Sequence, residues 1–218
     1  MLHVLRLSIG CELILCDGQN TDFCARLETI TAKPESVTFT IMSQSPSNTE
    51  SLIQVTLFQG LPKGDKLDWI IEKCIEAGIY RIIPVCTART VVKVKDPVKK
   101  AERFTRISES AAGQCMRGII PYISPPINFS DALLEHDSNS LCLLAYEKER
   151  IRTVKCVLNN IHPRPISLWV GPEGGFDDSE VKALEDIGAV PISLGPRILR
   201  TETAGLVALA QILCIWEN

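Results

Sequence analysis

Apolar runs and amphipathic stretches alternate along the chain from Leu52 onward, and this alternation most limits the possible folds. The apolar runs predict buried strands at 52–59, 80–85, 141–146, 166–171 and 190–195. Strands that alternate with helices favour a mostly parallel sheet covered on both faces, a three-layer α/β fold. Ligands of such sheets bind beyond the carboxyl ends of the strands.

Two of the intervening helices are predicted residue by residue. The helix over residues 65–78 ends at Gly78 and buries apolar side chains at helical spacing, namely Leu67, Ile70, Ile71, Cys74 and Ile75. A second helix is predicted from Pro97 to Gln114. Its inward face is expected to hold Val98, Ala101, Thr105, Ser108 and Ala112, and its outward face Lys99, Arg103 and Arg106.

The first part of the chain has a different pattern, with short strands predicted at 11–17, 22–31 and 37–42. Residues 43–51, SQSPSNTES, have the composition of a linker. We therefore expect a small β domain over residues 1–46 and an α/β domain over residues 47–218. A β module of that size buries little core by itself.

Composition excludes several classes of protein. The opening residues do not resemble a signal peptide, and the longest apolar segment, 204–216, is shorter than the roughly 20 residues of a membrane span. We therefore expect a cytoplasmic protein. The nine cysteines are scattered without a C-x-x-C pair, and the chain has three histidines. This predicts no metal site, and it predicts that the cysteines are buried small hydrophobes in a reducing compartment.

Charge is unevenly distributed along the chain. The formal net charge is −3, but residues 60–118 hold twelve Lys and Arg against seven Asp and Glu, a balance of +5. A basic segment in an acidic chain is typical of a local surface for nucleic acid.

A glycine-rich loop, GPEGG at 171–175, follows the strand predicted at 166–171. Asp177 and Glu180 have the spacing of a capping box, so a helix should begin at about Asp178. The loop is either a tight turn or a ligand site. It lacks the glycine order of a dinucleotide loop and the lysine of a P-loop, and Glu173 would repel a phosphate. A cationic or neutral nucleoside suits it better.

A second loop, LGPRILRTETAG at 194–205, follows the last predicted strand. Thr201 is expected to cap the final helix. Residues 204–216 are apolar on almost every side, which predicts burial in the core or against another subunit. Arg200 and Glu202 are either a structural ion pair or part of a site.

Together the two loops resemble the signature of the RsmE-type 16S rRNA (uracil-N3)-methyltransferases of the SPOUT superfamily. Further similar segments occur in order along the chain. They are HVLRLSIGCELILCDG at 3–18, KGDKLDWIIEKCIEAGI at 63–79, TARTVVK at 87–93 and ESAAGQCMRGIIP at 109–121. The resemblance therefore covers essentially the whole chain.

The resemblance implies a SPOUT-type C-terminal domain with a deep trefoil knot, and a PUA-like N-terminal β-barrel that is about one strand shorter at its start than in the family. It implies a homodimer that methylates N3 of a uridine in 16S rRNA of the small ribosomal subunit, with S-adenosylmethionine as methyl donor. Two alternatives remain open: a SPOUT methyltransferase that acts on tRNA, and a PUA-like RNA-binding protein without catalysis.

We expect three sets of site residues, the cofactor set from the resemblance, the RNA set largely from the basic segment, and the catalytic set from the chemistry of methyl transfer. The methyl donor is expected to contact Leu144, Ala145, Tyr146, Glu147, Val170, Gly171, Pro172, Glu173, Gly174, Gly175, Leu194, Gly195, Arg197, Ile198, Leu199, Thr203 and Ala204. RNA is expected to contact Arg6, Lys66, Lys73, Arg89, Lys93, Lys99, Arg103, Arg106, Gln114 and Arg117. For catalysis, we expect Arg200 to stabilise negative charge on the uracil oxygens, and Glu202 to accept the proton or to orient Arg200.

Overall fold

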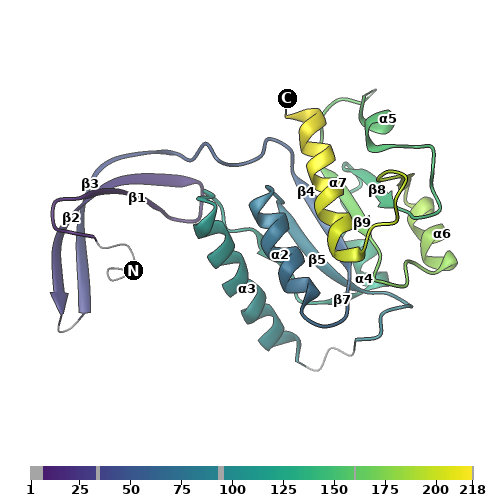
Figure 1. Cartoon of the computed structure of the whole chain (residues 1–218), viewed down its shortest axis with the longest axis horizontal. Helices are drawn as coiled ribbons and strands as arrows, with labels where there is room; N and C mark the ends of the chain where they lie inside the picture. The colour runs from purple at the N-terminus through teal and green to yellow at the C-terminus, as the bar shows by residue number, and fades with distance from the viewer. Residues whose placement is uncertain (1–6, 33–34, 93–95, 160, 218) are drawn as a thin grey trace. The chain divides into compact units, whose positions relative to one another are not determined.

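The computed structural model describes residues 7–32, 35–92, 96–159 and 161–217, and the chain divides into two compact units (Figure 1). The first unit comprises Met1–Glu50 and Met116–Ile120, and the second comprises Ser51–Cys115 and Pro121–Asn218. This division differs from the predicted one in two respects. It falls after residue 50 instead of residue 46, and it assigns a later segment, 116–120, to the first unit.

The first unit contains a three-stranded antiparallel sheet of β1 (Glu12–Cys16), β2 (Thr21–Ala32) and β3 (Glu35–Pro46), in that order. The predicted linker was therefore wrong over its first residues, because Ser43 and Pro46 continue β3, where they pair with β2. Strand pairing by the backbone overrides the linker-like composition here.

Residues 116–120 are tied into the first unit by hydrogen bonds. The backbone N–H of Asn20 donates to the carbonyl oxygen of Gly118 at 2.7 Å, and the N–H of Gly118 donates to Thr49 Oγ1 at 3.0 Å. A Cβ on Gly118 would lie 2.3 Å from the Cβ of Ser47, so only glycine fits. The segment is thus an integral part of this unit.

The second unit is built on a seven-stranded sheet. The strands are β4 (Val55–Gly60), β5 (Arg81–Cys86), β6 (Tyr122–Ile123), β7 (Ile127–Asn128), β8 (Leu141–Ala145), β9 (Ile166–Val170) and β10 (Val190–Ile192). Their order is β10-β8-β9-β4-β5-β6, with β7 also pairing with β5, and each of these pairings is parallel. The predicted parallel α/β fold is confirmed.

Helices cover both faces of this sheet. They are α2 (Lys66–Glu76), α3 (Pro97–Gln114), α4 (Phe129–Leu134), α5 (Val154–Leu158), α6 (Asp178–Asp186) and α7 (Thr201–Trp216). Because successive strand residues point to opposite faces, Leu57 and Leu168 pack with α2, α3, α5 and α7, whereas Phe58 and Trp169 pack with α4 and α6. The rings of Phe58 and Trp169 stack at 4.2 Å between centroids. The result is three layers.

The two helix predictions had different outcomes. In α2, every apolar residue predicted to face inward is buried. The predicted bounds of α3 are confirmed, but its predicted inward face was wrong in part: Val98 is 67% exposed, Thr105 is exposed, and Phe104 and Ala111 are buried instead. The apolar pattern of α3 is weak, and its largest apolar side chain, Phe104, determines which face packs on the core.

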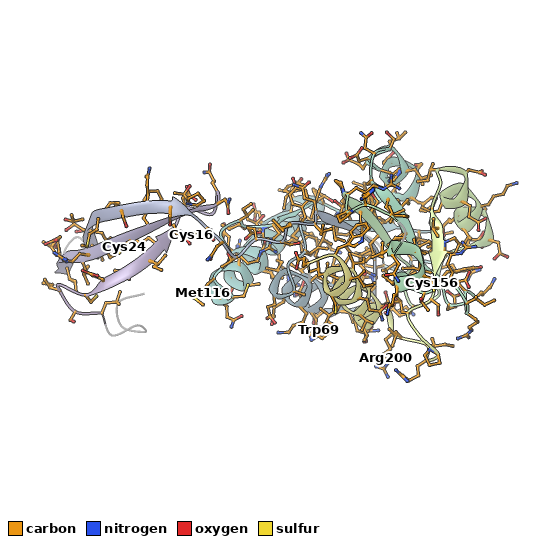
Figure 2. All side chains as sticks on the ribbon, turned by 90° about the horizontal axis from the view of Figure 1, so that it is seen from above. Cys16, Cys24, Trp69, Met116, Cys156 and Arg200 are labelled. Atoms are coloured by element: carbon orange, nitrogen blue, oxygen red, sulfur yellow. The ribbon has the colours of Figure 1, made fainter. Side chains whose placement is uncertain are left out.

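The cysteines are more exposed than predicted. Cys74 and Cys142 are buried, and burial raises the pKa of each thiol to about 12. Cys16, Cys156 and Cys214 are exposed, and Figure 2 labels the first two. The prediction failed because a cysteine inside an apolar pattern can still lie on the solvent-facing side of its strand or helix. No helix among the described residues is long and apolar enough to span a membrane.

Candidate active site

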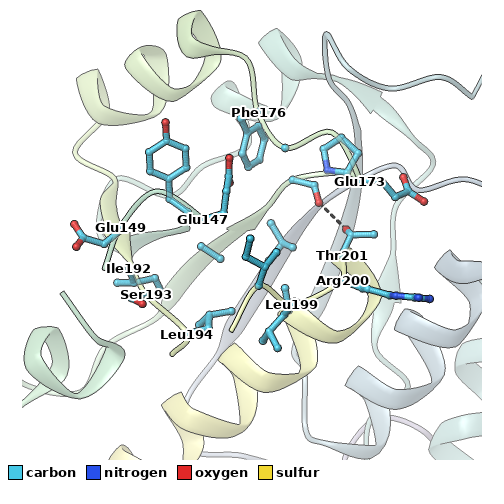
Figure 3. A pocket seen from close by; sticks show the side chains of 18 of the residues that line it. Glu147, Glu149, Glu173, Phe176, Ile192, Ser193, Leu194, Leu199, Arg200 and Thr201 are labelled. Atoms are coloured by element: carbon cyan, nitrogen blue, oxygen red, sulfur yellow. Dashed lines mark hydrogen bonds between the residues drawn. The ribbon is translucent and has the colours of Figure 1, made fainter. Parts of the chain in front are cut away.

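A cavity of about 450 Å³ opens beyond the carboxyl ends of β8, β9 and β10 (Figure 3). Its size is within the range of small-molecule sites, roughly 300–1,000 Å³. Three chain segments supply most of its lining, after β8 (145–150), after β9 (170–176) and around the second loop (192–201), and Lys66 and Ala204 complete it. The two loops singled out in the sequence meet here because β8 pairs with both β9 and β10.

The glycine-rich loop is built as the sequence predicts. The Asp177 side chain accepts a hydrogen bond from the N–H of Ser179, and Glu180 accepts one from the N–H of Asp177 at 2.9 Å, so the capping box is confirmed. Gly175 has a φ of +68°, and a Cβ on Gly171 would lie 3.1 Å from Gly175. The loop therefore folds back on itself in a way that side chains would prevent.

Gly60, which the sequence analysis did not single out, supports the base of this loop. A Cβ at this position would lie 2.4 Å from both Cδ and the backbone nitrogen of Pro172. The end of β4 and the start of the loop thus approach each other more closely than a β-carbon allows. The glycine-rich composition of residues 171–175 indicates the loop side of this contact. Nothing in the sequence around Gly60 indicates the strand side.

Lys66 joins the loop to the start of α7. Its Nζ lies 2.9 Å from Glu173 Oε1 and 3.3 Å from Glu202 Oε2. Burial raises the pKa of the Glu173 carboxyl, but hydrogen bonds from Lys66 and from backbone N–H groups, that of Lys63 included, outweigh it and hold the pKa below its usual range. The hydrogen bond to Glu173 raises the pKa of Lys66. Lys66 was predicted to contact RNA, and in the structure it lines the cavity.

Arg200 lies at the N-cap of α7 and is largely free to reach a ligand. Its side chain is 82% exposed, and its Nη1 is 3.9 Å from Glu202 Oε1. An ion pair that long and that exposed contributes little to stability. Glu202 is only 18% exposed and lies closer to Lys66. The alternative of a simple structural Arg200–Glu202 pair is thus disfavoured.

The residues predicted to contact a cofactor line the cavity, with two exceptions. Leu144 is fully buried on the opposite face of the sheet with Trp169, because the side chains of β8 alternate. Thr203 does not line the cavity either, because helical geometry turns Thr201 and Ala204, three residues apart, to the same side. For these two residues, the lining of the cavity does not support the predicted contact.

Several lining residues were missed by sequence reasoning. They are Glu149, Arg150, Phe176, Ile192, Ser193 and Thr201. Backbone N–H groups of Ile151 and Arg152 donate to Glu149 Oε1 and lower the pKa of this carboxyl. The place of Glu149 just after a strand end could have been a signal for it.

Thr201 does not cap α7 as predicted. It is the first residue of the helix, and its Oγ1 donates to the carbonyl oxygen of Gly171 at 2.6 Å (Figure 3). A long-range hydrogen bond thus takes the place of the expected local one.

Part of the predicted RNA surface lies along a groove of about 650 Å³ between α2 and α3. Lys73, Arg103, Arg106 and Gln114 line this groove, and Lys99 is exposed on the same helix as the last three. Most of these cations have acidic neighbours: Lys73 pairs with Glu72 and Glu76, Arg103 with Asp65 and Asp68, and Arg106 with Glu102.

Other residues of the predicted RNA set are placed differently. Arg89 lies in a turn after β5, and its Nη1 donates to the carbonyl oxygen of Gly174 at 2.8 Å. The Arg117 side chain is 6% exposed and forms an ion pair with Glu50 inside the first unit. Burial and this pairing favour a structural role over direct RNA contact. Arg6 and Lys93 lie outside the described residues.

The parallel sheet and the cavity at its carboxyl edge define an enzyme-like α/β domain, and residues 49–213 match the family described as RNA methyltransferase domain. The chain belongs to the ribosomal RNA small subunit methyltransferase E family.

Named relatives cover nearly the whole chain. It is 36% identical to "Ribosomal RNA small subunit methyltransferase E" of Bacillus subtilis, over 97% of this chain and 85% of that protein. The protein of the same name from Synechocystis is 34% identical, over 99% of this chain and 70% of its own length. The crystal structure of the Neisseria gonorrhoeae protein of that name, bound to S-adenosyl methionine, is 31% identical, has a TM-score of 0.86, and is matched over 99% of this chain and 87% of its own.

Proposed function

We propose that the protein transfers the methyl group of S-adenosylmethionine to N3 of a uridine in 16S rRNA of the small ribosomal subunit, in the cytoplasm. The observation that carries the proposal is the cavity formed by the two loops at 171–175 and 194–200. The family, the names of the relatives and the S-adenosyl methionine bound to a similar protein support it.

The cavity fits this methyl donor better than a phosphorylated nucleotide. Backbone amides and carbonyls of Gly171–Gly175 and Leu194–Leu199 would hold the adenosine part, and Ala145, Tyr146 and Glu147 would close the third side. Glu173 contributes a carboxylate, which disfavours phosphates and suits a cation. Bound S-adenosylmethionine supplies an electrophilic methyl group on a positively charged sulfur.

In this proposal, Arg200 stabilises the reacting base. Uracil N3 becomes a good nucleophile once its proton is lost, and the negative charge then spreads to the ring oxygens. The exposed guanidinium at the cavity edge would donate hydrogen bonds to one of these oxygens. Glu202, beside both Lys66 and Arg200, would orient these two cations and would be the carboxylate that receives the proton.

RNA would cross the exposed stripe of Lys99, Arg103 and Arg106 on α3, with Gln114 near its end. The groove between α2 and α3 lies beside this stripe. The target base must be unpaired or flipped outward to expose N3. We assign the first unit a PUA-like RNA-binding role.

We further propose that the second unit forms a homodimer and contains a deep trefoil knot. Val207, Ala210 and Cys214 follow one another along α7 at helical spacing, and the last two are exposed, as expected of a surface that meets a partner. For the knot, the support is that the chain leaves β10 at the edge of the sheet and returns in α7 to pack on α2 and β4.

Methylation assays with purified protein and S-adenosylmethionine test the proposed function. Small ribosomal subunits from a deletion strain should accept one methyl group, located at N3 of a uridine by mass spectrometry, and tRNA should accept none. Arg200→Ala should lower kcat strongly while it keeps affinity for S-adenosylmethionine. Near-normal turnover of that variant would remove Arg200 from the chemistry, and methylation of tRNA alone would reassign the substrate.

A further inference from the structure

Gln59 is a fully buried amide near the end of β4, one residue before Gly60. Its Nε2 donates to the carbonyl oxygen of Gly60 at 3.0 Å and to Thr201 Oγ1 at 2.9 Å. Thr201 Oγ1 in turn donates to the carbonyl oxygen of Gly171 at 2.6 Å. These hydrogen bonds link a strand end, the first residue of α7 and the first residue of the glycine-rich loop.

The hydrogen bonds that link Gln59, Thr201 and Gly171 can run in only one direction. The carbonyl oxygens of Gly60 and Gly171 accept hydrogen bonds and cannot donate them. The Gln59 amide must therefore present its NH2 group, and the Thr201 hydroxyl must point its proton at Gly171. A reversed amide would set Oε1 of Gln59 against the oxygen of Gly60. A directed chain of this kind fixes both side chains in one arrangement.

The other end of the Gln59 amide is less well satisfied. Its Oε1 is buried and has no hydrogen-bond partner among the described residues. A buried acceptor without a partner costs free energy, so an apolar residue would suit this end better. The two donated hydrogen bonds are the feature that requires glutamine here.

We propose that Gln59 and Thr201 are positioning residues that set the Gly171–Gly175 loop for binding of the methyl donor. The inference rests on the proposed function. The loop has almost no side chains of its own to hold its shape, and the carbonyl oxygen of Gly171 is bound at the point where the loop leaves β9. Because Thr201 lies between Arg200 and Glu202, the same hydrogen bond fixes the start of α7 at the cavity edge.

Thr201→Val and Thr201→Ser test the hydroxyl. Valine keeps the shape and removes the donor, and we expect the Kd for S-adenosylmethionine to rise about tenfold by calorimetry, equivalent to about 1.4 kcal/mol. Serine keeps the hydroxyl and should bind within about twofold of the natural protein. Ser108→Ala is the matched control, because Ser108 Oγ is also buried in a helix and donates to a backbone carbonyl, that of Pro121, at 2.7 Å. It should lower Tm but leave the Kd unchanged.

Gln59→Glu tests the amide with a nearly identical shape. A carboxyl at this position donates a hydrogen bond only while it is protonated, so affinity for S-adenosylmethionine should fall as pH rises, and the natural protein should not share this dependence. A purely structural role would change Tm without producing that difference.

The outcomes separate the two proposals. If the natural protein binds no S-adenosylmethionine, the proposed function fails. If the natural protein binds it and Thr201→Val binds equally well, or Gln59→Glu has the pH dependence of the natural protein, the positioning role is overturned.

Discussion

Lys66 Nζ lies 2.9 Å from Glu173 Oε1, so a single ammonium group ties the first residue of α2 to the glycine-rich loop. The same group lies 3.3 Å from Glu202 Oε2. Three segments that bound the cavity therefore share one cation, and removal of that cation leaves two carboxylates at the cavity edge without their common partner.

Lys66→Met should raise the pKa of the Glu173 carboxyl, which can be followed by NMR titration. In the natural protein this pKa is lowered by folding, so Glu173 stabilises the fold above its unfolded pKa of about 4.3, and that stabilisation is lost as pH falls through the folded pKa. Lys66→Met should weaken this acid dependence. At neutral pH the variant should lose less than about 1 kcal/mol, because the pair is partly exposed.

Lys63→Met is the control. Among the contacts of the described residues, Lys63 reaches Glu173 only through its backbone N–H, which the substitution keeps. Its Glu173 titration should match that of the natural protein. If Glu173 titrates equally in Lys66→Met and in the natural protein, Lys66 is not what lowers the pKa of Glu173.

Gly60→Ala should destabilise the protein by about 1–3 kcal/mol in urea unfolding, because the new Cβ would lie 2.4 Å from Pro172 and the backbone must shift. Affinity for S-adenosylmethionine should fall as well, because the shift moves the cavity wall. Gly113→Ala is the matched control: a Cβ there meets nothing within 4 Å inside α3, so stability should rise by up to about 1 kcal/mol.

Arg117→Met should lower the free energy of unfolding by about 3–5 kcal/mol, because it leaves Glu50 with a charge in a nearly buried site. Arg26→Met removes an exposed pair with Glu12 in the same unit and should cost less than about 1 kcal/mol. Denaturant titration compares the two. If both variants lose a similarly small free energy of unfolding, Arg117 has no structural role and stays a candidate for RNA contact.

Replacing Lys99 and Arg106 together by glutamine should flatten the salt dependence of RNA binding, by about 0.7 in the log–log slope for each phosphate that the protein no longer neutralises. Lys182→Gln on α6 supplies an exposed cation away from the stripe, and its slope should equal that of the natural protein. Fluorescence anisotropy over a range of salt concentrations gives the slopes. No change in the double variant would place the RNA on another surface.

Sequence reasoning succeeded where the signal is periodic and local. The apolar spacing in α2, the bounds of α3 and the capping box at Asp177 each follow from a few neighbouring residues, and the structure confirms them. The parallel sheet followed from the alternation of strands and helices. The two loops predicted to form one pocket also meet.

The failures involve contacts between residues far apart in the chain. Thr201 was expected to bond within its own helix, but it binds Gly171 in another loop. Gln59 and Gly60 look like an ordinary strand end, and their roles depend on Pro172 and Thr201 arriving beside them. Arg117 looked like a surface cation until Glu50 was found beside it. A single sequence does not show which distant partner a polar residue will meet.

The hydrogen bonds from residues 116–120 to Asn20 and Thr49 set an order of events during synthesis. The ribosome makes the three strands of the N-terminal sheet first, but the partner of Asn20 and Thr49, which lie just before β2 and just after β3, emerges only after α3 has been translated. At roughly 5–20 residues per second, Asn20 and Thr49 wait several seconds for this partner. During that interval the first unit is incomplete, although its three strands have already been translated.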